Sequence, residues 1–326
     1  MTNHAIQWQL DLARLDAGEQ ARIISLLKRM EKELITKVAA GTTDWSKARI
    51  SQQMAEINTV IQRYYDIIAG HMTNTATELA QVSATSAGAA LSTLMDGAAS
   101  VLPSEAALRA LISDALIMGA PQAEWWSRQA ADVAFRFQSV FRQGLAAAET
   151  SQQIIKRVRE QMNVTRANAA ALVQTGMTSI ANEARMSVFQ VNSDVVTGVR
   201  WLATLDNKTC AVCGARDGMT WKLDGTPINA TLPFVQPPLH FNDRCVLSPQ
   251  TMFSGLGSGQ RASDAGPVDR KTTFEDFLAK NSDSWQDENL GKGRAQMWRD
   301  GKITLKDLTS GTGRPLTLDQ LRAKHK

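Results

Sequence analysis

The chain has 326 residues, of which 43% are hydrophobic and 21% are charged, enough apolar residues to form cores in two or three domains. The formal net charge of +4 is too small to indicate a nucleic-acid-binding protein, because such proteins usually concentrate basic residues in a stripe. No run of about 18 apolar residues and no signal peptide are present, so we expect no membrane contact and a reducing cytoplasm.

Apolar residues recur with helical spacing through the first 190 residues. Asp16, with Glu19 three residues later, predicts a helix start with a capping box, and residues 41–44 predict the end of that helix. The next helix carries the most regular pattern in the chain, in alternating steps of four and three. Its apolar seam consists of Ile50, Met54, Ile57, Ile61, Tyr64 and Ile68. Because the seam lasts only about three heptads, it favours a helix pair or bundle over an isolated coiled coil.

Residues 73–131 are rich in small side chains that allow close packing of helices. Ser104, between Pro103 and Glu105, predicts a helix start, and residues 119–121 predict a break. Trp125 and Trp126 point about 100° apart on a helix, so we expect one to pack and the other to be exposed. For the tryptophan that is exposed, a packing role is favoured over a role as an anchor for a partner protein.

Ser151 and Thr165 predict the N-caps of two further helices, residues 152–161 and 166–192. The first of these helices carries the densest basic cluster of the chain, Lys156, Arg157 and Arg159. We interpret this cluster as a solvated helix face rather than a DNA contact.

The character of the chain changes after residue 195. Strand-like segments at 199–205 and 219–223, with a turn at Asp224-Gly225, predict a small irregular β-rich module. The predicted fold class is therefore mainly α with a zinc-knuckle-like β module (α+β), an elongated helical N-terminal region and a short helical C-terminal tail. The predicted divisions are a helical assembly region 1–140, a second domain 141–253, a flexible linker 254–272 and a helical tail 273–326.

The three cysteines of the chain and one of its four histidines form a single pattern. Cys210 and Cys213 are a C-x2-C pair, and His240 and Cys245 follow as H-x4-C behind a Pro-Pro turn. Three cysteines and one histidine are a closed tetrahedral ligand set of structural zinc, with no position left for substrate. The sequence therefore predicts a structural metal site, with Gly214 providing a tight backbone turn after the pair.

Two other interpretations of the cysteines stay open. The thiols could be inert or form a disulfide, which needs an oxidising compartment and leaves one cysteine over. The C-x2-C pair could be a redox pair, which usually lies in a βαβ context that this sequence does not predict.

The residues around the cysteines resemble a known family, the phage Mu protein F-like minor head proteins of tailed bacteriophages. The family pattern is an Asp, a C-x2-C pair, an Asp-Gly, a Pro-Pro-x-His and then an Arg-Cys. The matching residues are Asp206, Cys210, Cys213, Asp217, Gly218, Pro238, His240, Arg244 and Cys245. Members usually end with a tight His-Pro-x-Cys-Arg-Cys run, whereas this chain has His240-Phe-Asn-Asp-Arg-Cys245, with a single cysteine at the end.

The resemblance extends over residues 141–249. It includes two upstream segments, 150–158 and 165–176, where the family usually has Glu at the position of Gly176. A weaker resemblance links residues 273–321 to a segment at the end of phage head proteins.

The resemblance implies a structural protein of the phage head, acting in head morphogenesis. Its implied partners are the portal protein, the major capsid or scaffolding protein, further copies of itself and phage DNA during packaging or ejection. Its implied location is the virion, at the head interior or portal vertex, after assembly in the host cytoplasm. We expect the N-terminal helices to carry the surface for assembly, and the tail is too short for the toxin domain of some relatives.

Two alternatives from other functional classes remain. The first is a zinc-dependent nucleic-acid-binding module that acts in DNA packaging, which a steep salt dependence of DNA affinity would reveal. The second is a ββα-metal nuclease, which His240 and Asn242 superficially resemble. His4, His71 and His325 lie far away in sequence, so no general base remains, and we expect no enzyme.

Overall fold

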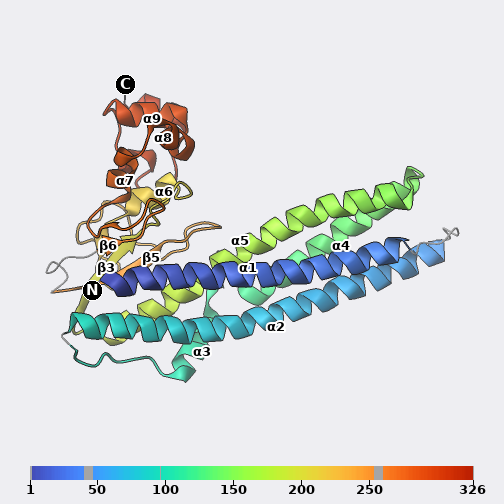
Figure 1. Cartoon of the computed structure of the whole chain (residues 1–326), viewed down its shortest axis with the longest axis horizontal. Coiled ribbons are helices and arrows are strands. Elements are labelled where there is room, and N and C mark those ends of the chain that lie inside the picture. Colours follow the sequence, from blue (N-terminus) through green and yellow to red (C-terminus); the bar gives the residue numbers. More distant parts are fainter. Residues whose placement is uncertain (1, 40–46, 96, 253–259, 326) are drawn as a thin grey trace.

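The computed structural model describes residues 2–39, 47–95, 97–252 and 260–325 of the chain. Long helices form an elongated bundle, and a small sheet with short C-terminal helices lies at one end of it (Figure 1). The mainly α architecture with a small β module that the sequence predicts is thus confirmed. None of the helices in the described ranges has the length and apolar character that crossing a lipid bilayer requires.

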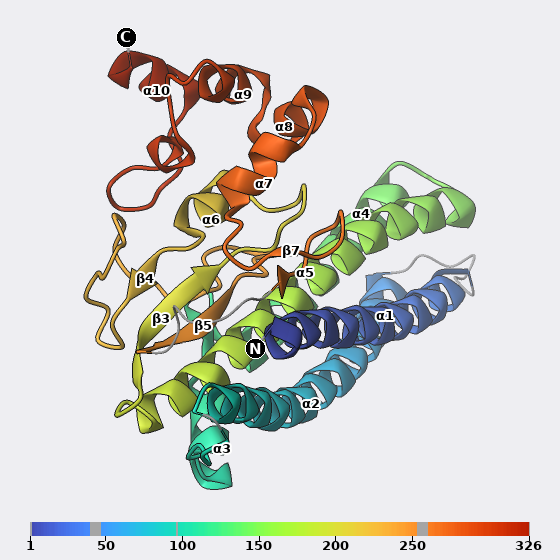
Figure 2. The same ribbon diagram turned by 60° about the vertical axis from the view of Figure 1, so that its left-hand side comes forward.

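The bundle is built from two helical hairpins. The first consists of α1 (Thr2–Ala39) and α2 (Lys47–Leu94), and the second of α4 (Gln122–Ala146) and α5 (Ser151–Val191). α5 packs against both α1 and α2 and thereby joins the hairpins. The end of α1, the start of α2 and the α4–α5 turn lie at the end of the bundle remote from the sheet, whereas the N-terminus of α1 lies beside the sheet (Figure 1, Figure 2).

The predicted helix start at Asp16 is wrong, because α1 begins well before it. Trp8 and Leu12 are buried and continue the apolar face of α1 toward the N-terminus. Asp16 lies inside the helix, where its side chain accepts a hydrogen bond from Gln20 at 2.8 Å. The predicted break at residues 41–44 lies outside the described residues.

The predicted seam of α2 is buried at Met54, Ile57, Ile61 and Ile68. The predicted seam includes Tyr64, but it is the neighbouring Tyr65 that is buried in the core, whereas Tyr64 is only partly buried. A straight helix drifts by about 20° per heptad relative to a 3.5-residue repeat, so a strict seam does not hold along a helix of 48 residues.

Between the hairpins, the structure has the helix start and the break that the sequence predicts. Ser104 is the N-cap of α3 (Glu105–Asp114), and its hydroxyl accepts a hydrogen bond from the amide of Ala107. β1 (Leu116–Ile117) and β2 (Ala120–Pro121) then form a two-residue hairpin at the predicted break.

The adjacent tryptophans both have packing roles. Trp126 is buried in the core. Trp125 is half-buried rather than exposed, because its indole nitrogen donates to the carbonyl of Ile117 at 2.6 Å and its ring packs edge-on against Phe241.

The two helices predicted for residues 152–192 are a single helix, α5. Thr150, not Ser151, is the N-cap and forms a capping box with Gln153. Thr165 lies inside α5, where its hydroxyl donates to the carbonyl of Gln161 at 3.1 Å. A threonine can satisfy its hydroxyl within a helix in this way, so its cap propensity alone did not mark a boundary.

The sheet has β3 (Val196–Leu202) at its centre, with β4 (Thr220–Trp221) and β5 (Val246–Thr251) as antiparallel neighbours. The helix α6 (Ala211–Arg216) lies between β3 and β4 in the chain.

Part of the segment predicted to be a linker forms a hairpin, of β6 (Gln260–Arg261) and β7 (Val268–Asp269). It is docked because Arg261 is buried in an ion pair with Asp217. Residues 253–259 lie outside the described part of the chain.

The tail folds as short helices around its own apolar cluster. Thr317 caps the last helix and forms a capping box with Gln320. The helical elements are α7 (Phe274–Lys280), α8 (Asp283–Leu290), α9 (Lys292–Arg299), η1 (Leu305–Leu308) and α10 (Leu318–Lys324).

Candidate metal centre

The C-x2-C pair lies at the start of α6. Cys210 is the N-cap residue, and its carbonyl accepts the first helical hydrogen bond, from the amide of Gly214 at 2.9 Å. Cys213 follows almost one turn later, and this spacing turns both sulfurs toward the same side.

His240 closes one side of the site. Its Nε2 lies 3.1 Å from Sγ of Cys210 and 3.3 Å from Sγ of Cys213. Its Nδ1 lies 2.8 Å from the carbonyl oxygen of Phe241, which can only accept a hydrogen bond. With the proton on Nδ1, Nε2 presents its lone pair to the two sulfurs, the arrangement found in metal-bound histidines.

Cys245 lies on the other side of Cys213, at the entry to β5. The two sulfurs and a carboxylate oxygen of Asp243 lie within 4.8 Å of one another. Asp243 shapes the loop, because Oδ1 accepts from the amide of Cys245 at 2.8 Å and Oδ2 from the amide of Leu239 at 2.7 Å. Both carboxylate oxygens of Asp243 are thus occupied by backbone amides, so the sulfur of Cys245 is the better donor for a metal.

The four predicted residues therefore lie around one small cavity, but as two overlapping groups that share Cys213. With zinc–sulfur and zinc–nitrogen bonds of about 2.3 and 2.0 Å, tetrahedral ligands lie about 3.5 Å apart. The separations between His240 and the two sulfurs are slightly shorter than this. The donor types, the histidine tautomer and the spacing all fit a zinc ion.

Without a bound metal, the pKa values of the four groups favour a thiolate at Cys210 beside a protonated His240. Hydrogen bonds from Cys213 and from His240 lower the pKa of Cys210 to about 4. The hydrogen bond to Cys210 raises the pKa of His240 to about 9, and burial raises the pKa of Cys245 to about 12. The same contact with Cys210 raises the pKa of Cys213. A bound metal cation would instead favour the thiolate forms of all three cysteines and the neutral form of His240.

The three cysteines, all within the described part of the chain, are unpaired. The sheet around them is antiparallel, and the described residues contain no parallel βαβ unit of the kind that surrounds redox C-x-x-C pairs. The structure therefore favours the metal interpretation over a disulfide or a redox pair.

Two aspartates that flank the site, Asp206 and Asp217, form ion pairs with arginines. Arg244 and Asp206 form a bidentate ion pair, in which Nη1 donates to Oδ2 at 2.5 Å and Nη2 donates to Oδ1 at 2.8 Å. Burial would raise the pKa of Asp206, but the hydrogen bond from Arg244 outweighs it and the pKa is lowered. The side chain of Asp217 is fully buried against Arg261 and two backbone amides.

The sequence analysis missed the residues that tie the site to the bundle. Asn182 of α5 donates to the carbonyl of Cys245 and accepts from the amide of Leu247. Thr175 accepts from the amide of Asn242 at 3.0 Å. Asn182 follows Thr178 and Ser179 at helical spacing on α5, and this line of small polar residues was the available signal, since buried polar groups need partners.

Gly214 has a different role from the predicted turn. It lies inside α6, and a Cβ at this position would overlap the ring of Phe274. The glycine is therefore needed for close packing of α6 against α7.

No second histidine with a described side chain joins the site. His71 pairs with Glu19 between α1 and α2, and His325 lies near Asp307 in the tail. The side chain of His4 lies outside the described part. A nuclease-like pair of histidines is thus absent from the described residues around Cys213.

Comparisons with known proteins bear on these elements. Searches of curated proteins and of solved structures gave no match. The phage Mu protein F like family matches residues 136–248, from the second half of α4 to the start of β5. This range includes α5 and all four predicted metal ligands, so residues 136–248 of the chain are similar to the phage Mu protein F like family, as the sequence pattern indicated.

Proposed function

We propose that the chain is a structural minor head protein of a tailed phage that acts in head morphogenesis. The observation that carries this proposal is the family match, which spans the long helix α5 and the complete Cys/His set. The proposal assigns no reaction to the chain. It places the protein in the virion, at the head interior or portal vertex, after assembly in the host cytoplasm.

The proposed role of the site is to stabilise the β module with one zinc ion, bound by Cys210, Cys213, His240 and Cys245. The neighbours of β3 are short, since β4 has two residues and β5 has six. Strands this short bury little apolar surface, and a structural zinc ion contributes folding free energy directly.

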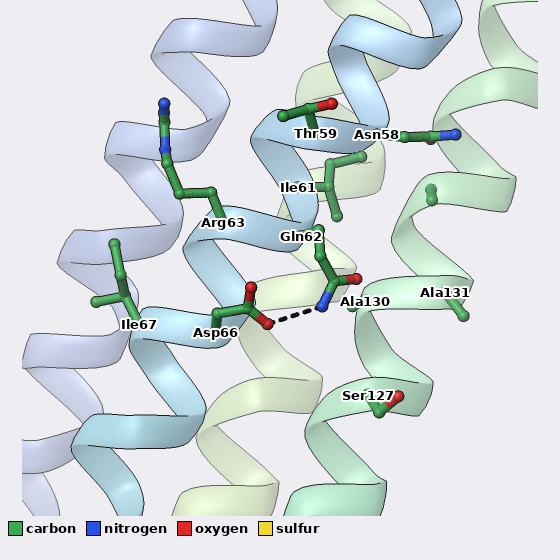
Figure 3. A pocket seen from close by; sticks show the side chains of 11 residues that line it. Asn58, Thr59, Ile61, Gln62, Arg63, Asp66, Ile67, Ser127, Ala130 and Ala131 are labelled. Atoms are coloured by element: carbon green, nitrogen blue, oxygen red, sulfur yellow. Dashed lines mark hydrogen bonds between the residues drawn. The ribbon is translucent and has the colours of Figure 1, made fainter.

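The proposed partners are the portal protein and the major capsid or scaffolding protein, with the bundle as the assembly surface. A groove of about 770 Å³ runs between α2 and α4. Figure 3 shows the small residues Ser127, Ala130 and Ala131 on α4, which lines the groove together with polar residues of α2 such as Gln62 and Asp66. Small residues allow another helix to approach closely, which supports this groove as a contact site for a head component.

We expect the double variant Thr59→Arg and Ala131→Arg, at two exposed groove positions, to reduce co-purification with the portal protein at least tenfold. Bulky charges in the groove would block a helix without disturbing the core. Pull-down from cells that assemble heads measures the effect, with Ser25→Arg, on exposed α1, as the matched control. Equal recovery of portal protein with both variants would contradict the proposed surface.

A contact with phage DNA is a second candidate role, and the charge distribution supports it. Residues 28–39, 47–56 and 136–166, at the remote end of the bundle, carry 12 Lys/Arg and 5 Asp/Glu. The rest of the chain carries 24 Lys/Arg and 27 Asp/Glu. Several acidic groups at this end already form ion pairs, such as Glu31 with Arg166 and Glu149 with Arg157. Exposed basic residues here are Lys28, Arg29, Lys32, Arg142, Lys156 and Arg159.

If this end contacts DNA, replacing Lys28, Lys32, Lys156 and Arg159 by glutamine will lower affinity at every sequence. Each lost phosphate contact will reduce the slope of log affinity against log salt by about 0.9. Fluorescence anisotropy with a duplex at several salt concentrations measures this. The control changes Lys271, Lys280 and Lys292 to glutamine. Affinity that depends on zinc but not on the four bundle residues would instead place the contact at the Cys/His module.

A further inference from the structure

The short helix α6 lies between the candidate metal site and the C-terminal segment, residues 273–325, and contacts both. Its Cys213 faces the metal site, whereas the next three residues face the C-terminal segment. Because these residues occupy a single helical turn, the position of Cys213 also sets the position of the surface on which the segment packs.

Two apolar contacts join α6 to the segment. Gly214 lies so close to Phe274 that a Cβ would overlap the phenyl ring. Ala215 belongs to the apolar cluster of the segment, together with Phe277 and Leu308. In Figure 2, α7 lies directly beside α6. A shift of α6 would therefore open the core of the C-terminal segment.

Arg216, the last residue of α6, is buried, with 2% of its surface exposed, and forms no ion pair with a carboxylate of the described residues. Its guanidinium donates to the carbonyl of Pro233 at 3.1 Å and lies 5.8 Å from the ring centre of Trp201. Its Nε has no hydrogen-bond partner within the described part of the chain. A buried cation without an anionic partner is costly, so the surroundings must supply negative charge.

Burial lowers the pKa of the Arg216 guanidinium, whereas Cys213, Cys245 and Asp243 act in the opposite direction, so these three groups of the site lie within electrostatic reach of Arg216. Three thiolates and one neutral imidazole around Zn²⁺ have a net charge of −1, which one arginine balances. The other arginine at the site, Arg244, is already paired with Asp206. The charge of Arg216 thus matches the charge that the loaded site would carry.

Arg216 also contacts the C-terminal segment. A Cβ on Gly313 would collide with the Nη2 atom of Arg216, and Gly313 adopts a positive φ of 80°. A second link lies on the other side of the site. Asn289 of α8 donates to the carbonyls of Asn207 and Thr209, in the turn that leads into Cys210.

We propose that Arg216 is the counter-cation of the metal-loaded site and that, through α6, metal binding holds residues 273–325 on the β module. This inference rests on the proposed zinc site. It makes Arg216 a positioning residue, because it acts on the metal through electrostatics and on the C-terminal segment through packing. Loss of metal would leave Arg216 without its anionic partner and would release the segment.

Hydrogen exchange of the full-length protein, with zinc and after chelation, tests the proposal. We expect chelation to raise exchange rates at least tenfold in α7, α8 and η1, while α2 and α5 keep their protection. Arg216→Leu should lower zinc affinity about tenfold, since partners beyond the ligands commonly contribute factors of about 10–100, and should loosen the segment even with zinc. Arg216→Lys keeps the charge and should restore most of the affinity. The matched control is Arg322→Leu, on exposed α10.

The outcomes separate this inference from the proposed zinc site. A wild-type protein that binds no zinc would overturn both. A protein that binds zinc but shows the same exchange in residues 273–325 with and without it would overturn only the coupling. Wild-type zinc affinity in Arg216→Leu would overturn the role of Arg216.

Discussion

Replacing Cys213 by serine is expected to lower the affinity for zinc by at least a thousandfold and to unfold the β module. Cys213 is buried, and it is the residue shared by both groups of candidate ligands. Zinc binding contributes about 10–16 kcal/mol to the folding of zinc-finger peptides, so loss of one thiolate has a large effect. Competition with a coloured chelator measures the affinity, and protease resistance of residues 195–250 reports the folding.

Two further variants identify the fourth ligand. Cys245→Ser should lower zinc affinity nearly as much as Cys213→Ser. Asp243→Asn should have a smaller effect, because the carboxylate of Asp243 already accepts hydrogen bonds from Leu239 and Cys245. If Asp243→Asn lost the metal and Cys245→Ser kept it, Asp243 would be the ligand and the proposed set would be wrong.

Replacing Asp217 by alanine is expected to cost about 3–5 kcal/mol of the free energy of unfolding, because it leaves a buried arginine unpaired. The side chain of Asp217 is fully buried. It accepts hydrogen bonds from the amides of Ala203 and Phe274, both at 2.7 Å, and from Arg261 at 2.8 and 3.0 Å. It therefore connects β3, the β6–β7 hairpin and α7. Urea denaturation monitored by tryptophan fluorescence measures the change.

Asp276→Ala is the matched control for Asp217. Asp276 is an exposed aspartate in a capping box with Thr273, and its loss should cost about 1 kcal/mol. Equal small losses for both variants would mean that the Asp217–Arg261 pair contributes little to stability. A double variant, Asp217→Asn with Arg261→Met, should recover part of the loss, because it removes the unpaired charge.

The helical bundle could be predicted from periodicity, but its boundaries could not. The seam of α2 follows from its apolar spacing, and residues such as Ile57 and Ile61 are fully buried as expected. Asp16 and Thr165 misled the prediction, because cap-forming residues can also satisfy their side chains within a helix. Continuous burial along α1 and α5 outweighed these local signals.

The members of the candidate site could be predicted from spacing, since cysteines and a histidine at such intervals have few other uses. Its surroundings could not. Arg216 and Asp217 follow the predicted ligand Cys213 by three and four residues, yet no local pattern marks either as buried. Arg261 lay in a segment with linker-like composition, and its burial depends on a carboxylate 44 residues away. Charge pairs between residues so far apart in the chain cannot be predicted from the local sequence.

The zinc content of the purified wild-type protein is the most direct test of the proposed zinc-stabilised module. Native mass spectrometry and elemental analysis give the metal per chain, and thiol titration under native conditions gives the number of free cysteines. The account predicts one zinc per chain and thiols that react only after chelation. A metal-free folded protein with three freely reacting thiols would contradict it.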